Sequence, residues 1–96
     1  MNFETAPDIG IDSIPRIGRG FRLQWESVQD AYVLLYPEGM VQLNRSAGEI
    51  LARCESGRTV TGIVHELEMV FGQNDLVRDV IAFLELAHAQ HWVDFA

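Results

Sequence analysis

Histidine and cysteine are the side chains of this chain that metal binding or nucleophilic catalysis would use. His65 and Glu66 begin the pattern H-E-x-x-H of zinc proteases, but Met69 stands where that motif needs its second histidine. His88 and His91 have the spacing of neighbours on one helical face, yet no third ligand accompanies them. We therefore expect no metal site and interpret the two histidines as favourable charges near a helix C-terminus.

Cys54, the only cysteine, falls on the apolar stripe of a predicted helix, where a buried structural thiol is expected rather than a nucleophile. A single cysteine also excludes an intrachain disulfide. The sequence contains no G-x-S-x-G motif, no phosphate-binding loop and no dinucleotide-binding fingerprint. These observations predict a protein that is not an enzyme and that holds no cofactor of its own.

The composition limits the classes of partner. The chain has 96 residues, the size of one domain, and a net charge of −7. This charge argues against nucleic acids and anionic membrane surfaces, because both are bound largely through Lys and Arg. The acidic N-terminus lacks the apolar run of a signal peptide, and no window approaches the length of a membrane span. We expect a cytoplasmic protein with a peptide or protein partner.

The strands are predicted from hydrophobic periodicity. Residues 1–20 mix acidic residues with Pro and Gly, so we expect an irregular or mobile arm there and a single domain over 21–96. Strands are expected over 21–25, 32–36 and 40–43, forming an antiparallel meander. Pro37 fits the first corner of a turn, and Gly39 fits the left-handed position of a three-residue hairpin loop.

Three helices should follow the strands. The start and stop signals are a capping box from Ser46 to Glu49, Gly57 after the first helix, Thr59 and Gly72 around the second, and Asn74 before the third. The tail 91–95 is expected to lie back on the fold. The sequence therefore predicts an α+β domain of winged-helix type, with a three-stranded antiparallel meander followed by three helices.

The third predicted strand is the first candidate for a binding site. Residues 40–44 contain neither charge nor proline, the usual protection of a sheet edge, so an extended peptide could add there as a further strand. A dimer partner or the N-terminal arm would cover the same edge equally well. Trp25, Tyr32, Tyr36 and Trp92 are either binding anchors or core residues.

The helices around Gly72 raise a different possibility, a helix-turn-helix that binds DNA. Residues 74–91 carry one arginine against Asp75, Asp79 and Glu85, which is a poor surface for the major groove. DNA binding therefore stands as the weaker alternative, beside a purely structural dimer.

The ordered pattern of the whole domain resembles a known family. The residues that carry the resemblance are the run Tyr32-Val33-Leu34-Leu35-Tyr36-Pro37-Glu38-Gly39, then Leu43-Asn44, Ala47, Ile50-Leu51, Gly57 and Thr59, with Pro15-Arg16, Arg19-Gly20 and Arg22-Leu23 before them and Trp92 after them. In this set the chain is similar to the coenzyme PQQ synthesis protein D family, PqqD. His91 departs from the pattern, because glycine is expected before the tryptophan.

The resemblance implies a role in pyrroloquinoline quinone (PQQ) biosynthesis. PqqD-like domains are peptide chaperones, or recognition elements for ribosomally made and modified peptides. Here the partners would be the precursor peptide PqqA and the radical SAM enzyme PqqE, which would hold the iron–sulfur clusters and S-adenosylmethionine. By the same resemblance, the peptide lies along the third strand and the third helix. The implied contact residues are Met40, Val41, Gln42, Leu43, Asn44, Leu76, Asp79, Val80 and Phe83.

Three further expectations complete this interpretation. The peptide should bind with a dissociation constant near the micromolar range, about −8 kcal/mol, because ordering a flexible peptide costs about 2–5 kcal/mol. Val41→Pro should abolish binding if the Val41 N–H points outward from the sheet. The chain is expected to be either a monomer or a homodimer.

Overall fold

The computed structural model describes residues 8–96 and contains a three-stranded antiparallel sheet in the order β2-β3-β4. Its strands are β2 (Arg22–Glu26), β3 (Ala31–Tyr36) and β4 (Gly39–Gln42). In the β2–β3 pair Arg22 lies opposite Leu35, and in the β3–β4 pair Val33 lies opposite Gln42. The predicted meander is confirmed, with strand ends within one residue of those expected.

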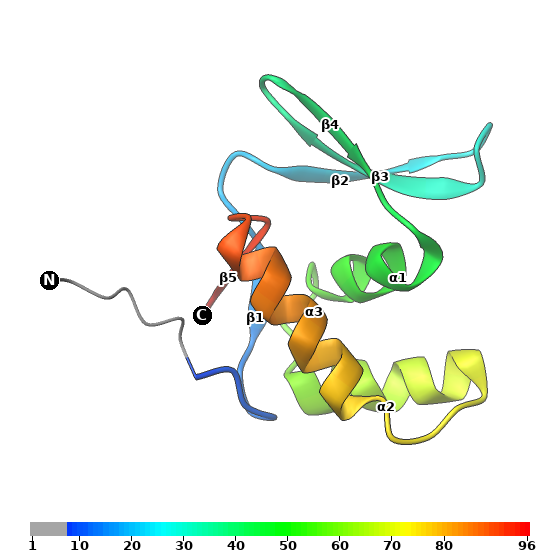
Figure 1. Cartoon of the computed structure of the whole chain (residues 1–96), viewed down its shortest axis with the longest axis vertical. Coiled ribbons are helices and arrows are strands. Elements are labelled where there is room, and N and C mark those ends of the chain that lie inside the picture. The colour runs from blue at the N-terminus through cyan, green and yellow to red at the C-terminus, as the bar shows by residue number, and fades with distance from the viewer. Residues whose placement is uncertain (1–7) are drawn as a thin grey trace, which may run out of the picture.

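Three helices follow the sheet and pack beneath it (Figure 1). They are α1 (Arg45–Arg53), α2 (Val60–Phe71) and α3 (Val77–Ala89). Helix α1 lies next to the sheet, α2 lies farther from it, and α3 runs across both helices (Figure 1). The predicted α+β architecture of winged-helix type is therefore the observed one.

A second, two-stranded sheet joins the two ends of the described chain. Strand β1 (Pro15–Ile17) pairs antiparallel with β5 (Val93–Phe95), and Arg16 forms an ion pair with Asp94 at 2.7 Å. Ala96 also donates its backbone N–H to the Ile14 carbonyl at 3.0 Å. The tail returns to the fold as predicted, but the expectation of an irregular arm is wrong for residues 15–17.

Between residue 8 and β1, the predicted arm is bonded to the start of α2. The carbonyls of Ile11 and Ser13 accept the backbone N–H groups of Thr61 and Val60 at the start of α2. These bonds fix the stretch before β1 to the helical layer. Residues 1–7, on which the expectation of a mobile arm also falls, lie outside the described residues.

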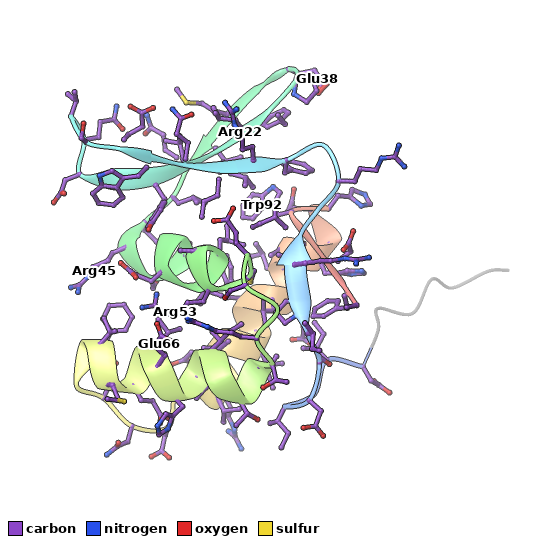
Figure 2. The ribbon with its side chains drawn as sticks, turned by 180° about the vertical axis from the view of Figure 1, so that it is seen from behind. Arg22, Glu38, Arg45, Arg53, Glu66 and Trp92 are labelled. Carbon is purple, nitrogen blue, oxygen red and sulfur yellow. The ribbon has the colours of Figure 1, made fainter. Side chains whose placement is uncertain are left out.

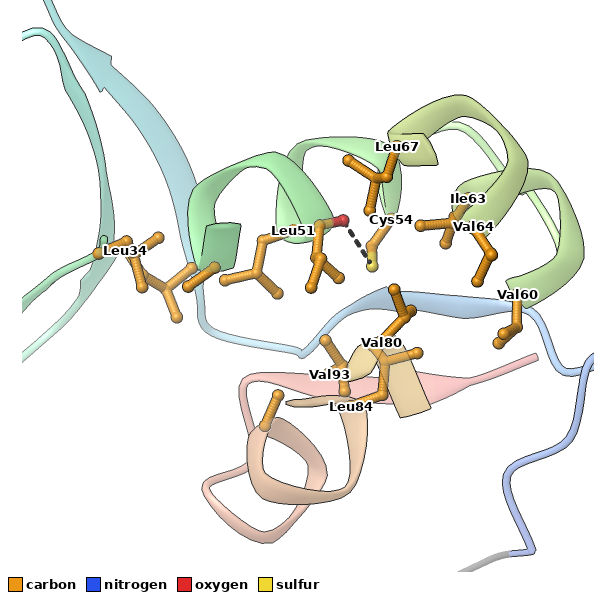
Figure 3. Packing of buried hydrophobic residues seen from close by; sticks show 14 residues of the cluster. Leu34, Leu51, Cys54, Val60, Ile63, Val64, Leu67, Val80, Leu84 and Val93 are labelled. Atoms are coloured by element: carbon orange, nitrogen blue, oxygen red, sulfur yellow. Dashed lines mark hydrogen bonds between the residues drawn. The ribbon is translucent and has the colours of Figure 1, made fainter. Parts of the chain in front are cut away.

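The core lies among the three helices and β5, and Leu34 of the main sheet closes it at one end (Figure 3). Leu34 from β3, Leu51 from α1, Ile63 from α2 and Leu84 from α3 are each fully buried, with 0% of their surface exposed. Removing such a side chain costs about 2–5 kcal/mol, because the lost transfer energy adds to the cost of a cavity. This packing fixes α1 and α3 relative to the main sheet.

The capping residues of α1 and α2 can be compared with those predicted from the sequence. Asn44, rather than Ser46, caps α1, and its side-chain oxygen accepts the N–H of Ala47 at 2.8 Å. The predicted capping box is therefore wrong, because the helix begins at Arg45, which places Ser46 inside its first turn and makes Asn44 the capping residue. Thr59 and Gly72 bound α2 as predicted, with Gly72 in the left-handed conformation at φ 62°.

Two other predicted boundaries are wrong. Helix α3 begins after Leu76 without a side-chain cap, so Asn74 does not cap it. Helix α1 is followed at once by Cys54 as its C-cap, and Gly57 lies in the turn beyond it. Leu76 instead has its N–H bonded to the Glu68 carboxylate of α2 at 3.2 Å, so a side chain from the preceding helix supplies the missing acceptor.

The β3–β4 hairpin is tighter than expected. Tyr36 pairs directly with Gly39, so the loop consists of the two residues Pro37 and Glu38. Gly39 is not among the glycines with positive φ, and the prediction of a left-handed glycine there is wrong. A Cβ at Gly39 would lie 3.4 Å from the Tyr36 hydroxyl, which is a van der Waals contact, so neither backbone conformation nor space demands glycine there.

Candidate functional site

Strand β4 leaves one edge of the main sheet open. Within residues 8–96 it pairs with β3 and with no other strand. Leu43, just after the strand, donates its N–H to the Tyr32 carbonyl at 3.3 Å. Successive residues of an antiparallel strand turn their N–H and C=O groups alternately toward and away from the partner. Met40 and Gln42 therefore present theirs to the open edge.

The same alternation corrects the expectation about Val41. Val41 lies opposite Leu34 and two residues before Leu43, so its N–H and C=O face β3. Val41→Pro was expected to abolish binding only if the Val41 N–H points outward. It points inward, so this substitution removes a hydrogen bond inside the sheet. A proline at Gln42 would remove an outward N–H instead.

A groove of about 280 Å³ runs between β4 and the C-terminal half of α3. Its lining residues are Val41, Gln42, Leu43, Asn44, Ser46, Ala47, Phe83, Leu86 and Trp92. Five predicted site residues meet here: the four from Val41 to Asn44, and Phe83. Leu86 and Trp92 were missed, although Trp92 was named as a possible anchor. Leu86 lies off the buried stripe of α3, with 52% of its surface exposed.

A second hollow, of about 490 Å³, opens among the three helices. It is lined by Arg45, Ser46, Ile50, Leu67, Phe71, Gln73, Leu76, Asp79 and Val80. Three predicted residues, Leu76, Asp79 and Val80, lie here and not in the first groove. Ser46 borders both hollows. The ninth predicted residue, Met40, lines neither and is 54% exposed on the opposite face of the sheet.

Charged side chains link α1 to α2 at the second hollow and beyond it. The Arg45 guanidinium lies 4.8 Å from the centre of the Phe71 ring, which links α1 to the end of α2. Farther along, Arg53 bonds both Glu49 at 2.7 Å and Glu66 at 3.0 Å, and Arg58 also bonds Glu66 (Figure 2). The hydrogen bond from Arg58, with the nearby charge of Arg53, holds the pKa of the Glu66 carboxyl below its usual value. This network fixes α1 against α2.

Neither an activated thiol nor a metal-binding cluster is found in residues 8–96. Burial raises the pKa of the Cys54 thiol to about 12, and its Sγ donates to the Ile50 carbonyl at 3.3 Å (Figure 3). Such a thiol is a core side chain and a poor nucleophile. Over residues 8–96, no three His, Cys, Asp or Glu side chains gather closely enough to hold a metal ion. Nor does this part of the chain contain a helix long and apolar enough to cross a membrane.

The exposed side of α3 bears on the DNA alternative. Arg78 is exposed there together with Asp79 and Glu85, so the outward surface carries more negative than positive charge. A helix that enters the major groove needs the opposite balance, because the phosphates repel carboxylates. This surface does not favour nucleic acid.

The fold and the site define a small α+β domain of winged-helix type, with an unpaired sheet edge beside an apolar groove. Residues 31–93 match the model of the family described as Coenzyme PQQ synthesis protein D (PqqD). The chain belongs to the PqqD family.

Curated relatives and a solved structure agree with that assignment. The chain is 52% identical to a "PqqA binding protein" of Pseudomonas aeruginosa over 85 residues, covering 88% of this chain and 92% of the relative. A "PqqA binding protein" of Azotobacter vinelandii is 45% identical over the same length and the same shares.

The structural match is to the solution structure of the PqqD truncation of Methylobacterium extorquens PqqCD, described as a functional, stand-alone recognition element for ribosomally synthesised and modified peptides. It is 26% identical with a TM-score of 0.68, and the match covers 83% of this chain and 87% of that one.

Proposed function

We propose that this protein is a peptide chaperone of PQQ biosynthesis, which binds the precursor peptide PqqA along the open edge of β4 and presents it to the radical SAM enzyme PqqE. The observation that carries the proposal is the outward direction of the Met40 and Gln42 backbone groups beside an apolar groove. Family membership and the names of the relatives supply the identity of the peptide.

The proposed contacts divide by type. Met40 and Gln42 would exchange backbone hydrogen bonds with an added strand, which gives affinity with little dependence on sequence. Phe83, Leu86 and Trp92 would receive apolar side chains of the peptide, because they form the wall of the groove opposite β4. The alternate side chains of the added strand would then supply selectivity.

The second hollow would extend the site past the end of β4. Leu76 and Val80 offer an apolar lining, and Arg45 and Asp79 bring one charge of each sign. Because Ser46 borders both hollows, a peptide that leaves the β4 groove over the start of α1 would enter the second one. Leu43 and Asn44 would lie at this crossing.

The proposed role is non-catalytic. The buried Cys54 thiol offers no nucleophile, and the cofactors of the pathway step would belong to PqqE. The cargo is made on ribosomes, so the proposed place of action is the cytoplasm. We further propose that the recognition domain starts before residue 21, since β1 and the stretch ahead of it bond to β5 and α2.

A titration of isotope-labelled protein with synthetic PqqA peptide tests the proposal. We expect saturable shifts of the backbone amides of residues 40–44 and of Phe83 and Leu86, with a dissociation constant in the micromolar range. A peptide of the same composition in scrambled order is the control. Shifts confined to the outer residues of α2, or equal shifts with the scrambled peptide, would contradict the proposed groove.

The presentation step has its own test. Unlabelled PqqE added to the labelled protein with bound peptide should broaden the protein's resonances, because the complex tumbles more slowly. Unchanged line widths at saturating PqqE would remove the enzyme from the proposal and leave peptide binding in place.

A further inference from the structure

A third, smaller hollow of about 190 Å³ opens between the β2–β3 hairpin and the start of α1. Its walls include Trp25 and Tyr32 from the sheet, Asp30 from the hairpin turn, and Arg45 and Glu49 from α1. This volume lies below the roughly 300–1,000 Å³ of sites that enclose a drug-sized ligand. We call this hollow the hairpin pocket, and its size suits one side chain.

The aromatic wall of the hairpin pocket is fixed in place. Trp25 packs edge-on against Tyr32, with ring centroids 4.9 Å apart, yet 48% of the Trp25 surface is exposed. Tyr32 lies against Gly48 of α1, where a Cβ would come within 2.9 Å of the tyrosine ring. Glycine weakens a helix interior, so its use at this buried position is explained by the room that the ring needs.

The free charge at the hairpin pocket is negative. The Glu49 carboxylate is bonded to Arg53 at 2.7 Å, whereas Asp30 is exposed and takes part in none of the ion pairs formed within residues 8–96. The Arg45 guanidinium lies 4.8 Å from the centre of the Phe71 ring, which lines the second hollow and not this one. The positive charge of Arg45 is therefore drawn toward α2.

We propose that the hairpin pocket binds the side chain of a lysine or arginine from a partner chain. A cationic head is attracted both by the aromatic rings and by the carboxylates, while its aliphatic stem covers the exposed face of Trp25. An anionic side chain would meet like charge. A neutral apolar one would cover Asp30 without giving it a partner. The net charge of −7 also attracts a basic partner to this surface.

The hairpin pocket is separate from the proposed peptide site. None of its lining residues belongs to β4, and it shares only Asn44 with the groove beside that strand. A basic side chain held here leaves the open edge of β4 free. The partner is therefore a chain other than the added strand, and the proposal does not depend on the proposed function.

A titration of isotope-labelled protein with Nα-acetyl-lysine N-methylamide, at constant ionic strength, tests the pocket. We expect saturable shifts of the Trp25 indole N–H and of the Asp30 and Ala31 amides, with a dissociation constant in the millimolar range. The norleucine derivative has the same chain without the charge. It should bind roughly fivefold more weakly or worse, because it loses both the ring and the carboxylate attraction.

Two substitutions test the two attractions separately. Asp30→Asn keeps the size of the side chain and tolerates the left-handed backbone at φ 55°, and it should weaken binding about two- to fivefold. Trp25→Leu removes the exposed ring and should weaken binding by a similar factor, about two- to fivefold. Asp12→Asn is the matched control, because Asp12 is an exposed carboxylate outside the pocket and its loss changes the net charge equally.

Asp12→Asn should bind the lysine derivative as the wild type does, and far-ultraviolet circular dichroism should show all variants folded. Shifts that do not saturate, equal binding of the norleucine derivative, or an Asp30→Asn variant that binds like wild type would overturn the proposal. The titration is then repeated with PqqA peptide at saturation, where the affinity for the lysine derivative should stay the same. Displacement of the derivative by PqqA would overturn the assignment of the pocket to a separate partner.

Discussion

Gln42→Pro should weaken PqqA binding while leaving the domain folded. Proline has no N–H, and the N–H of Gln42 points to the open edge, so the bond that is lost is one with the peptide. Val41→Pro should instead destabilise the fold, because the Val41 N–H faces Leu34 within the sheet. The two neighbouring substitutions therefore separate binding from stability.

The magnitude follows from one backbone hydrogen bond and its unpaired acceptor. A typical bond contributes about 0.5–1.5 kcal/mol net, and an acceptor left unsatisfied at the interface costs about 1–3 kcal/mol. We expect Gln42→Pro to lose about 1–3 kcal/mol of binding free energy, a roughly 5- to 150-fold increase in Kd. Gln42→Ala keeps the N–H and should stay within about threefold of wild type, because the side chain is exposed.

Isothermal titration of each variant with synthetic PqqA peptide gives the Kd, and urea unfolding gives the stability. The free energy of unfolding should fall more in Val41→Pro than in Gln42→Pro. Gln42→Pro that binds peptide as tightly as Gln42→Ala would refute strand addition at β4. Gln42→Ala that loses as much affinity as Gln42→Pro would assign the effect to the side chain and not to the backbone.

Three further predictions concern the scaffold. Because burial raises the pKa of the Cys54 thiol to about 12, a thiol reagent should label the native chain only as fast as it unfolds; rapid labelling of folded protein would contradict the packing. The folded-state pKa of Glu66 is lowered from 4.5, so its stabilisation is present above that pH and is lost as the pH falls through the lower value. Glu66→Gln should therefore lower the free energy of urea unfolding more at about pH 7 than at about pH 3; equal losses at both would exclude the ion pairs as the cause. Gly18→Ala should cost about 1–3 kcal/mol, because a Cβ there would overlap the His91 carbonyl oxygen. The hydrogen bond from the backbone N–H of residue 18 to the Trp92 carbonyl should open. An unchanged rate of hydrogen exchange at this N–H would contradict the prediction.

Local sequence signals sufficed where a residue acts on its own neighbours. The alternation in β2, the apolar run of β3, and the Thr59 and Gly72 ends of α2 each depend on contacts within a few residues. The cap of α1 was missed because two good capping residues, Asn44 and Ser46, stand close together. Glu49, the other half of the expected box, pairs with Arg53 instead.

Long-range features could not be predicted in this way. Strand β1 is short, and its partner Asp94 lies 78 residues from Arg16, so no local pattern marks either strand. The site shows the same limit. Leu76, Val80 and Phe83 share one stripe of α3, but the helix crosses the fold, so its first half faces α1 and α2 while its second half faces β4. Leu86 was missed because it lies beside that stripe and lines the groove from the exposed side.

The pairing of Pro15 with Phe95 places the first and the last strand of the folded unit side by side. The β1–β5 ribbon is also a separate sheet from the one whose edges are open. A neighbouring domain fused after this unit would therefore be tethered at the ribbon, and one fused before it would be tethered where the stretch ahead of β1 bonds to the start of α2. Such a tether would raise the local concentration of the fused domain without crossing β4, and a short flexible linker gives effective concentrations in the millimolar range. The architecture thus permits fusion to an enzyme in either order.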